Sequence, residues 1–306
     1  MFVLEVSQST AVGILYFFMS VITLPLQLIL IKILMTQKEF RNLTAYRIMA
    51  HMSMCDCILV IGTFMGAIMS IGETNYHVYV ERVGGSFITA GWIGITFLSL
   101  LLALNRFLLF VGFKFNCLSE KVLYTIGLGI TWFSSVSLFV IHLIPTAALT
   151  YNIKFNAYTF TNDDLSRLFE HIEYLCIFST LIVIFVLCIA TVVAIIVQRN
   201  LHTSKFKLAA SEVKLFVQSV LIFLYLSTIR CMWHFGRALL YSNVVFVSLA
   251  VATQAVCSLN PLLYLIFNKA IREHFLGTLG LGKMKITSVK TKSQKTTSHK
   301  MGSNTI

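Results

Sequence analysis

The chain has 306 residues, of which 57% are hydrophobic and 12% are charged, and its mean hydropathy is +0.83. This composition lies outside the range of soluble globular proteins and predicts a chain that crosses a membrane several times. A net charge of +12 would suggest nucleic-acid binding in a soluble protein. In a membrane chain the placement of the charges is more informative, and we expect no nucleic-acid partner.

The seven cysteines lie mostly inside apolar runs, where a thiol behaves as a small hydrophobic group, so no disulfide framework is expected. The first ten residues carry Glu5 and no Lys or Arg, and so lack the basic start of a cleaved signal peptide. Seven apolar runs follow, each long enough for a membrane helix, which needs about 20 residues. The predicted spans are 11–35, 46–71, 83–111, 122–145, 174–197, 213–235 and 244–267. We therefore expect an all-α fold, a seven-transmembrane helix bundle over residues 11–267 in a lipid bilayer.

Lys and Arg residues are distributed unevenly between the two sides of this bundle. The loops and span ends on one side, together with the C-terminal segment, hold 19 of the 24 Lys and Arg residues. Because such loops face the cytoplasm, we expect a multi-pass protein of the plasma membrane with residues 1–10 outside and the C-terminus inside the cell. The longest outer connection, 146–173, is either a lid over a pocket or a solvated connector.

Two further segments follow the seventh span. Residues 268–281 keep Ile271, Phe275 and Leu279 near one face, which predicts a short interfacial helix on the inner leaflet. Residues 282–306 are rich in Lys, Ser and Thr and are expected to form a disordered basic cytoplasmic tail. Its hydroxyl groups either accept phosphate or belong to a solvated tail with no regulatory role.

The seventh span contains the sequence Asn260-Pro261-Leu262-Leu263-Tyr264 near its end. Proline removes a backbone donor and should kink the helix. Asn260 and Tyr264 are four residues apart, so one helix face can offer an amide and a phenol to an interior polar site. Taken alone, the motif is equally consistent with a kinked helix of a transporter or a membrane enzyme.

Asp56 is the only carboxylate deep within a predicted span, and Ser53 lies one turn away on the same face. An ionisable residue inside the membrane is by default a functional candidate. Asp56 could meet Asn260 in a hydrated polar or sodium-type site. The alternative is a protonated carboxyl group that is hydrogen-bonded by a neighbouring helix and has no switching role.

The third span ends on its inner side with Asn105-Arg106-Phe107. Arg106 either extends to lipid phosphates or pairs with Glu212, which precedes the sixth span on the same side. Such a pair would hold the inner ends of two helices together, and its release would open a crevice for a partner. Glu212 has a simpler alternative role in the first turn of a helix, where a negative charge favours the helix dipole.

In chain order, Asp56, Asn105-Arg106-Phe107, Trp132 and the motif from Asn260 to Tyr264 resemble rhodopsin-like G-protein-coupled receptors. The stretches that resemble nematode serpentine chemoreceptors, nearest to class T (Srt) and then to class X (Srx), are 46–49, 102–106 and 264–272. The resemblance implies a receptor that binds an extracellular small molecule and activates a heterotrimeric G protein. It also implies that Asp56 and the motif form the core switch and that Arg106 meets the G protein.

The chain departs from the superfamily pattern at several positions. Asn105 and Phe107 replace the usual acidic residue and Tyr, so either the contact with Glu212 is more important or basal activity is higher. No cysteine lies near the outer end of the third span or in 146–173, so the common loop disulfide is not expected. The sixth span lacks the usual proline, and the first span has Pro25 and Gln27 where an Asn would be expected.

Four side chains in the outer halves of the spans are candidates for a ligand pocket: Trp92, Arg230, His234 and Gln254. Each could instead anchor the membrane interface or pack in the core. Ile88, about five turns outward of Arg106, stands where amine receptors of the superfamily carry a carboxylate, so a cationic amine is disfavoured. No Lys lies within the seventh span, so a retinal Schiff base has no amine.

Two other classes of function remain as alternatives. A transporter or channel would use Asp56 and the kinked helix to line a permeation path. A membrane hydrolase would need three metal ligands on one side of the membrane, but His51 is inner whereas His142, His171 and His234 are outer. We therefore expect no catalytic residues, no metal and no cofactor.

Overall fold

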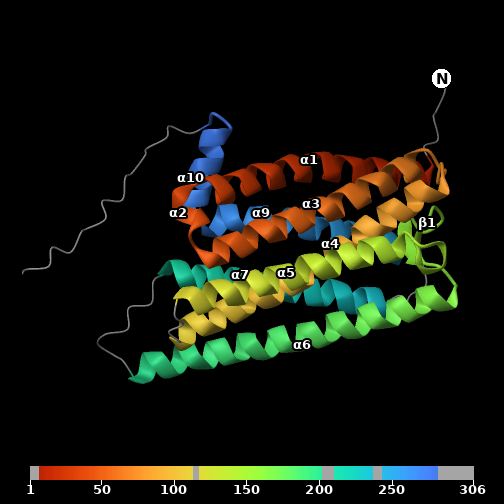
Figure 1. Ribbon diagram of the computed structural model, residues 1–306. Helices are drawn as coiled ribbons and strands as arrows, with labels where there is room; N and C mark the ends of the chain where they lie inside the picture. Colours follow the sequence, from red (N-terminus) through yellow and green to blue (C-terminus); the bar gives the residue numbers. More distant parts are fainter. Residues whose placement is uncertain (1–6, 113–116, 202–209, 237–242, 282–306) are drawn as a thin grey trace, which may run out of the picture.

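The computed structural model describes residues 7–112, 117–201, 210–236 and 243–281. Within these ranges, seven helices are long and apolar enough to cross a membrane, and they lie side by side as a bundle (Figure 1). They are α1 (Gln8–Thr36), α3 (Thr44–Ile71), α4 (Val78–Val111), α5 (Cys117–His142), α6 (Asp164–Leu201), α7 (Ala210–Cys231) and α9 (Asn243–Phe267). The predicted seven-helix fold is confirmed, and the tail predicted at 282–306 lies outside the described residues.

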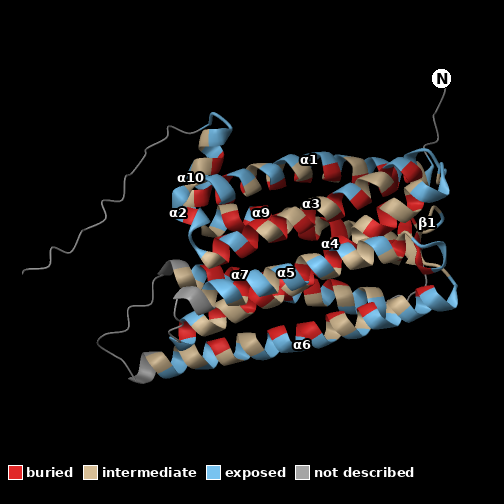
Figure 2. Ribbon diagram, viewed as in Figure 1, coloured by how far each residue is buried: buried red, intermediate tan, exposed pale blue. Residues whose placement is uncertain are grey.

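Helix α4 is the most central helix of the bundle. In its most apolar window 72% of the residues are buried, against 17% in α5 and 22% in α6. Figure 2 shows exposed residues on the outward faces of the peripheral helices. Many exposed residues are apolar, for example Phe133, Leu175 and Ile182. Exposed apolar surface of this extent is unfavourable in water but is covered by the hydrocarbon of a bilayer. The chain is therefore a multi-pass membrane protein.

The connection between α5 and α6, which the sequence analysis placed on the outer side, contains a β-hairpin that was not predicted. The end of the bundle that carries this hairpin is called the outer end below, and the opposite end is called the inner end. Strand β1 (Leu149–Asn152) pairs antiparallel with β2 (Ala157–Phe160), with Leu149 opposite Phe160 and Asn152 opposite Ala157. A short 3₁₀-helix, η1 (Pro145–Ala147), precedes it. Asn156 sits in the turn with φ of 50°, a left-handed conformation that asparagine tolerates better than most residues.

Tyrosine side chains attach this hairpin to the outer end of the bundle. Tyr158 donates to the Gly62 carbonyl at 3.1 Å. The Tyr151 hydroxyl lies 2.6 Å from Ser70 Oγ, and Ser70 in turn donates to Asn156 Oδ1 at 2.8 Å. Because Ser70 has one proton to give, Tyr151 is the donor in the first contact. Burial raises the pKa of Tyr151 to about 12, so the phenol keeps that proton at physiological pH.

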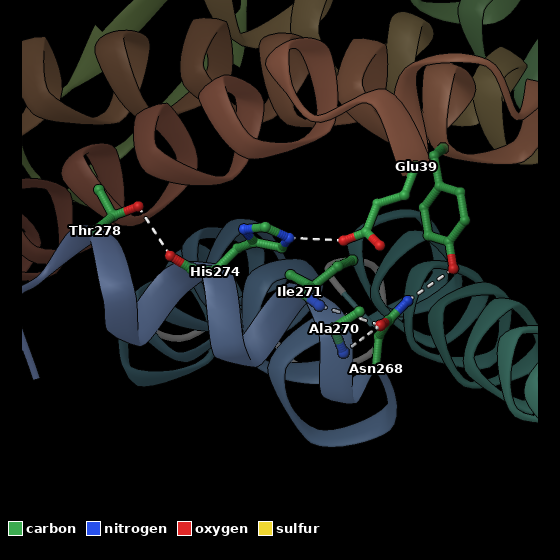
Figure 3. A network of polar contacts seen from close by, with 7 residues as sticks. Glu39, Asn268, Ala270, Ile271, His274 and Thr278 are labelled. Atoms are coloured by element: carbon green, nitrogen blue, oxygen red, sulfur yellow. Dashed lines mark hydrogen bonds and ion pairs between the residues drawn. The ribbon is translucent and has the colours of Figure 1, made fainter. Parts of the chain in front are cut away.

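At the opposite end, α10 (Lys269–Thr278) runs across the ends of the bundle helices (Figure 1). Its buried residues Ile271 and Phe275 pack with Phe40, which belongs to the short helix α2 (Lys38–Arg41). Asn268 caps α10, because its Oδ1 accepts from the Ala270 and Ile271 nitrogens (Figure 3). The short helix predicted within 268–281 is thus present.

Polar contacts to α2 and α3 also hold α10 to the rest of the bundle (Figure 3). Asn268 Nδ2 donates to the Tyr46 hydroxyl at 2.7 Å, which connects the start of α10 to α3. His274 Nε2 lies 2.6 Å from Glu39 Oε1, which connects its middle to α2. The position of α10 is therefore fixed by both apolar packing and hydrogen bonds.

The close packing of α1 on α3 depends on Gly13. A Cβ atom at this position would lie 2.8 Å from the Ile71 nitrogen and 2.9 Å from the Ala67 oxygen, so the two backbones would have to separate. We predict that Gly13→Ala destabilises the protein by about 1–3 kcal/mol, the usual effect of overpacking. Thermal unfolding in detergent measures this effect. The control is Gly129→Ala, where a Cβ would meet nothing within 4 Å; equal midpoints for the two variants would contradict the prediction.

Candidate functional site

A polar cluster in the bundle interior is centred on Asp56 of α3, whose side chain is fully buried. Asn260 of α9 donates from Nδ2 to Asp56 Oδ2 at 2.7 Å. Gln27 of α1 donates from Nε2 to the same oxygen at 2.9 Å, and this nitrogen also lies 2.5 Å from the Cys257 carbonyl oxygen. Three helices therefore converge on one carboxylate oxygen. The structure thus brings Asp56 and Asn260 together, and it adds Gln27 to them.

Gln27 was noted in the sequence only as a departure from the superfamily pattern, yet it is a full member of the cluster. The signal that could have identified it is its isolation, since it is the only side-chain amide in the first predicted span. A polar group in such a span is unfavourable against lipid and therefore points toward the bundle interior. The superfamily pattern has an asparagine in this span, and Gln27 supplies an amide nitrogen in its place from a longer side chain.

Several oxygens of this cluster have no hydrogen-bond partner among the described residues. They are Asp56 Oδ1, Ser53 Oγ, Asn260 Oδ1, Gln27 Oε1 and the Tyr264 hydroxyl. Buried oxygens of this kind usually bind water or a cation. A sodium ion at Ser53, Asp56 and Asn260 stays a prediction, to be checked by the dependence of thermal stability on sodium concentration. Pro261 is buried beside the cluster, inside α9, which extends without a break from Asn243 to Phe267.

At the inner end of the bundle, Arg106 of α4 pairs with Glu212 of α7. Arg106 Nη1 lies 2.5 Å from Glu212 Oε2, and the two side chains are 2% and 37% exposed. Arg106 therefore points into the bundle and not toward lipid phosphates. Glu212 also stands in the first turn of α7, so the helix-dipole role coexists with the ion pair.

The neighbours of Arg106 have different surroundings. Asn105 Nδ2 donates to the Tyr124 hydroxyl at 2.9 Å and so connects α4 to α5. Phe107 is half-buried. Tyr264 is fully buried in the apolar cluster that also contains Leu215 of α7. The structure places these residues around the inner pair, and their part in switching stays a prediction.

A cavity of about 160 Å³ lies at the outer end of the bundle, between the helices and the hairpin. All four pocket candidates, Trp92, Arg230, His234 and Gln254, line it. Lining residues that the sequence analysis missed come from α6, the π-helix η2 (Met232–Gly236) and α9, among them Glu173, Tyr174, Phe178, Trp233 and Thr253. Tyr151 and Tyr158 of the hairpin also line the cavity, and they belong to the connection that was considered as a lid. The hairpin therefore forms part of the cavity wall, which favours the lid over the simple connector.

Arg230 and Glu173 are the principal charged pair of this cavity. The Arg230 guanidinium carbon lies 4.0 Å from the Trp92 ring centroid, and Arg230 Nη2 lies 3.7 Å from Glu173 Oε1. The distance corresponds to an ion pair but exceeds a hydrogen bond. Glu173 was assigned to the outer loop because the fifth span was predicted to start at 174. That boundary was wrong, since α6 begins at Asp164 and places Glu173 more than two turns inside the helix.

The other two pocket candidates have contacts that fix their positions. The His234 ring stacks on Tyr174, with centroids 3.8 Å apart and planes inclined by 17°. Gln254 Nε2 donates to the Tyr16 carbonyl at 3.0 Å and to Ser20 Oγ at 2.6 Å, so it connects α9 to α1. Gln254 therefore has the packing role that the sequence analysis left open, while His234 forms part of an aromatic wall.

The histidines within the described ranges do not assemble into a metal site. Trp132 Nε1 donates to His51 Nδ1 at 3.2 Å, and His142 Nδ1 lies 2.6 Å from the Ala147 carbonyl oxygen. Among the described residues, no group of three or more His, Cys, Asp or Glu side chains could hold a metal ion. The hydrolase alternative thus has no ligand set in that part of the chain.

The two hydrogen bonds from Gln27 lead to a prediction about stability. Gln27→Leu should lower the free energy of unfolding by about 1–3 kcal/mol, because it removes one donor from Asp56 and leaves the Cys257 carbonyl unpaired. The control is Gln8→Leu at the exposed start of the same helix. Thermal unfolding of both variants in detergent measures the difference. A midpoint for Gln27→Leu at or above that of the unmodified chain would contradict the role given to Gln27.

The chain is similar in fold to a solved rhodopsin. The crystal structure of squid rhodopsin matches it with a TM-score of 0.69 over 89% of this chain and 85% of that chain, at 14% sequence identity. At this identity the likeness shows the fold alone. Comparison with curated protein sequences finds no significant match.

A protein-family model settles the family. The model described as "Serpentine type 7TM GPCR chemoreceptor Srt" matches residues 3–288. The match confirms the class T resemblance that was placed first, ahead of class X. It also assigns the chain to a family of receptors and not to a class of enzymes. Because the match covers nearly the whole sequence, the chain belongs to the Srt family of serpentine seven-transmembrane chemoreceptors.

Proposed function

We propose that the protein is a chemosensory receptor of the plasma membrane that detects an extracellular small molecule and activates a heterotrimeric G protein. The observation that carries this proposal is the position of two sites on one helix. Helix α4 bears Trp92 in the outer cavity and Arg106 in the inner ion pair. These residues are 14 positions apart, or about 21 Å along a helix. A ligand that displaces α4 at one end therefore acts on the ion pair at the other.

The proposed orientation puts the cavity outside the cell and the ion pair in the cytoplasm. The distribution of Lys and Arg supports it, because the Arg106 side of the bundle carries most of the positive charge. In this orientation α10 lies on the inner leaflet, with its exposed Leu276 and the exposed Leu279 that follows the helix available to lipid. The proposed division of the chain is 1–10 outside, 11–267 as the bundle, 268–281 as the interfacial helix and 282–306 as the basic cytoplasmic tail.

The proposed mechanism is a shift between two states of the bundle. In the structure, the pair of Arg106 and Glu212 holds the inner ends of α4 and α7 together. Ligand binding favours a second state in which the inner end of α7 has moved away and a crevice for the G protein has opened. The cluster of Asp56, Asn260 and Gln27 lies between the two sites and joins α1, α3 and α9. It therefore rearranges when these helices move.

The transporter alternative receives less support from the surroundings of Asp56. Its side chain is fully buried and hydrogen-bonded to α1 and α9, and it is not among the residues that line the outer cavity. A permeation path requires polar groups along a continuous opening. Screening cells that express the protein with volatile and water-soluble compounds, using a calcium or cyclic-nucleotide readout, tests receptor function directly. Substrate flux without a G protein would favour the transporter.

The inner pair gives a prediction for signalling. Arg106→Ala should abolish G-protein activation by a compound that activates the unmodified receptor, because the crevice then loses its buried cationic contact. Cells matched for surface expression and assayed with the same compound provide the measurement. Arg41→Ala, which removes an exposed Arg from the same side of the bundle, is the control. An unchanged response in Arg106→Ala would refute the assignment of Arg106 to the inner switch.

Removal of Glu212, the acidic partner of Arg106, should raise signalling and not abolish it. Glu212→Ala removes a charge-assisted hydrogen bond, and the exposure of Glu212 to solvent limits what that bond contributes. We predict a two- to tenfold rise, roughly 0.4–1.4 kcal/mol, in signalling without ligand. Glu273→Ala, which removes an exposed carboxylate on the same side, should leave it unchanged. Equal signalling without ligand from the two variants would contradict the restraint proposed for the pair of Arg106 and Glu212.

A further inference from the structure

The polar atoms of the outer cavity define what its ligand must offer. Arg230 Nε and Nη2 and Glu173 Oε2 are buried and have no hydrogen-bond partner among the described residues. The side chains are only 16% and 8% exposed, and the ion pair between them is too long for a hydrogen bond. Buried polar groups without a hydrogen-bond partner are unfavourable. A ligand that supplies an acceptor to Arg230 and a donor to Glu173 removes this penalty.

The charge of the pair limits the charge of that ligand. Arg230 and Glu173 compensate each other, so an anion attracted by Arg230 meets the Glu173 carboxylate, and a cation attracted by Glu173 meets the guanidinium. Glu170 also lines the cavity and is engaged in an interaction of its own. An uncharged head group with one acceptor and one donor satisfies both members without an uncompensated charge.

The size and walls of the cavity limit the rest of the molecule. The cavity measures about 160 Å³, close to the size of about 150 Å³ at which an engineered apolar cavity takes up benzene. Its walls include Trp92, Trp233 and Phe178, as well as the stacked rings of Tyr174 and His234. Flat aromatic walls favour stacking or edge contacts with a ring of the ligand. The body of the ligand is therefore small and apolar.

We propose that this cavity binds an uncharged aromatic molecule of about six to ten non-hydrogen atoms whose head group accepts from Arg230 and donates to Glu173. A primary carboxamide has this pattern, with one carbonyl oxygen and one NH₂ group side by side. The inference rests on the proposed receptor function, and it deepens that function by naming the ligand class. It also explains why Arg230 and Glu173, whose charges compensate each other, line the same cavity.

Four probes of similar size test the proposal by direct binding to the purified full-length protein in detergent. They are benzamide, benzoate, benzylamine and ethylbenzene, which present a neutral donor and acceptor, an anion, a cation and no polar head. Binding raises the unfolding temperature in proportion to affinity and needs no G protein. Benzamide should bind at least tenfold more tightly than each of the other three. A preference for benzoate, benzylamine or ethylbenzene, or no binding by any probe, would overturn the proposal.

Two variants make the test specific to the charged pair. Glu173→Gln leaves Arg230 uncompensated, so benzoate should gain at least tenfold in affinity relative to benzamide. Arg230→Gln leaves Glu173 uncompensated, so benzylamine should gain by the same factor. Arg167→Gln, an exposed outer residue on α6, is the control and should keep the original order. If Arg230→Gln does not fold, the result with Glu173→Gln is sufficient. An unchanged order of affinities for the four probes in Glu173→Gln would contradict the assignment of the ligand head group to this pair.

The test of the ligand class and the test of receptor function can fail independently of each other. Binding is measured without a G protein, whereas the basal signalling of Glu212→Ala is measured without a ligand. If the protein signals but does not prefer benzamide, only the proposed ligand class is refuted. If it binds benzamide as described but never activates a G protein, the proposed receptor function is refuted and the proposed binding site stands.

Discussion

The fold depends on the need to satisfy a carboxylate in the middle of an apolar bundle. Asp56 is fully buried, and its Oδ2 accepts hydrogen bonds from Asn260 and Gln27, which belong to two other helices. Without donors a carboxylate in this position would be strongly unfavourable, so α1 and α9 must stay in contact with α3. The arrangement also makes the bundle sensitive to small movements, because one oxygen is shared by two donors from different helices and neither can shift without affecting the other.

The central position of α4 follows from its composition. Small residues on its inner faces allow close approach by neighbours: a Cβ at Gly91 would lie 2.9 Å from Leu59 Cβ, and one at Gly85 would lie 2.5 Å from the Leu149 oxygen. The same helix therefore touches α3 in the interior and the hairpin at the outer end. A helix packed this tightly is suited to move as a rigid unit, as the proposed mechanism requires.

Much of this architecture could be predicted from the sequence, because a polar residue in an apolar span has few favourable positions. Asp56, Asn260 and Arg106 were identified on that basis, and Glu212 was identified as a partner for Arg106 at the start of the next span on the same side. The structure places the four residues in two contacting pairs. Glu173 was missed because hydropathy locates the apolar part of a helix and not its amphipathic extension, which here begins at Asp164. The hairpin was missed because its strands have only four residues each, too few for a reliable alternation pattern.

The attachment of the hairpin has a consequence for how the outer surface opens. The six cysteines whose side chains are described are free thiols, and the hairpin is held by the hydroxyl groups of Tyr151 and Tyr158. Hydrogen bonds break and re-form on thermal timescales, whereas a covalent bridge would require redox chemistry to release it. Separation of the hairpin from the bundle therefore requires the breaking of hydrogen bonds, and none of the six described cysteines forms a bridge that would first have to be reduced.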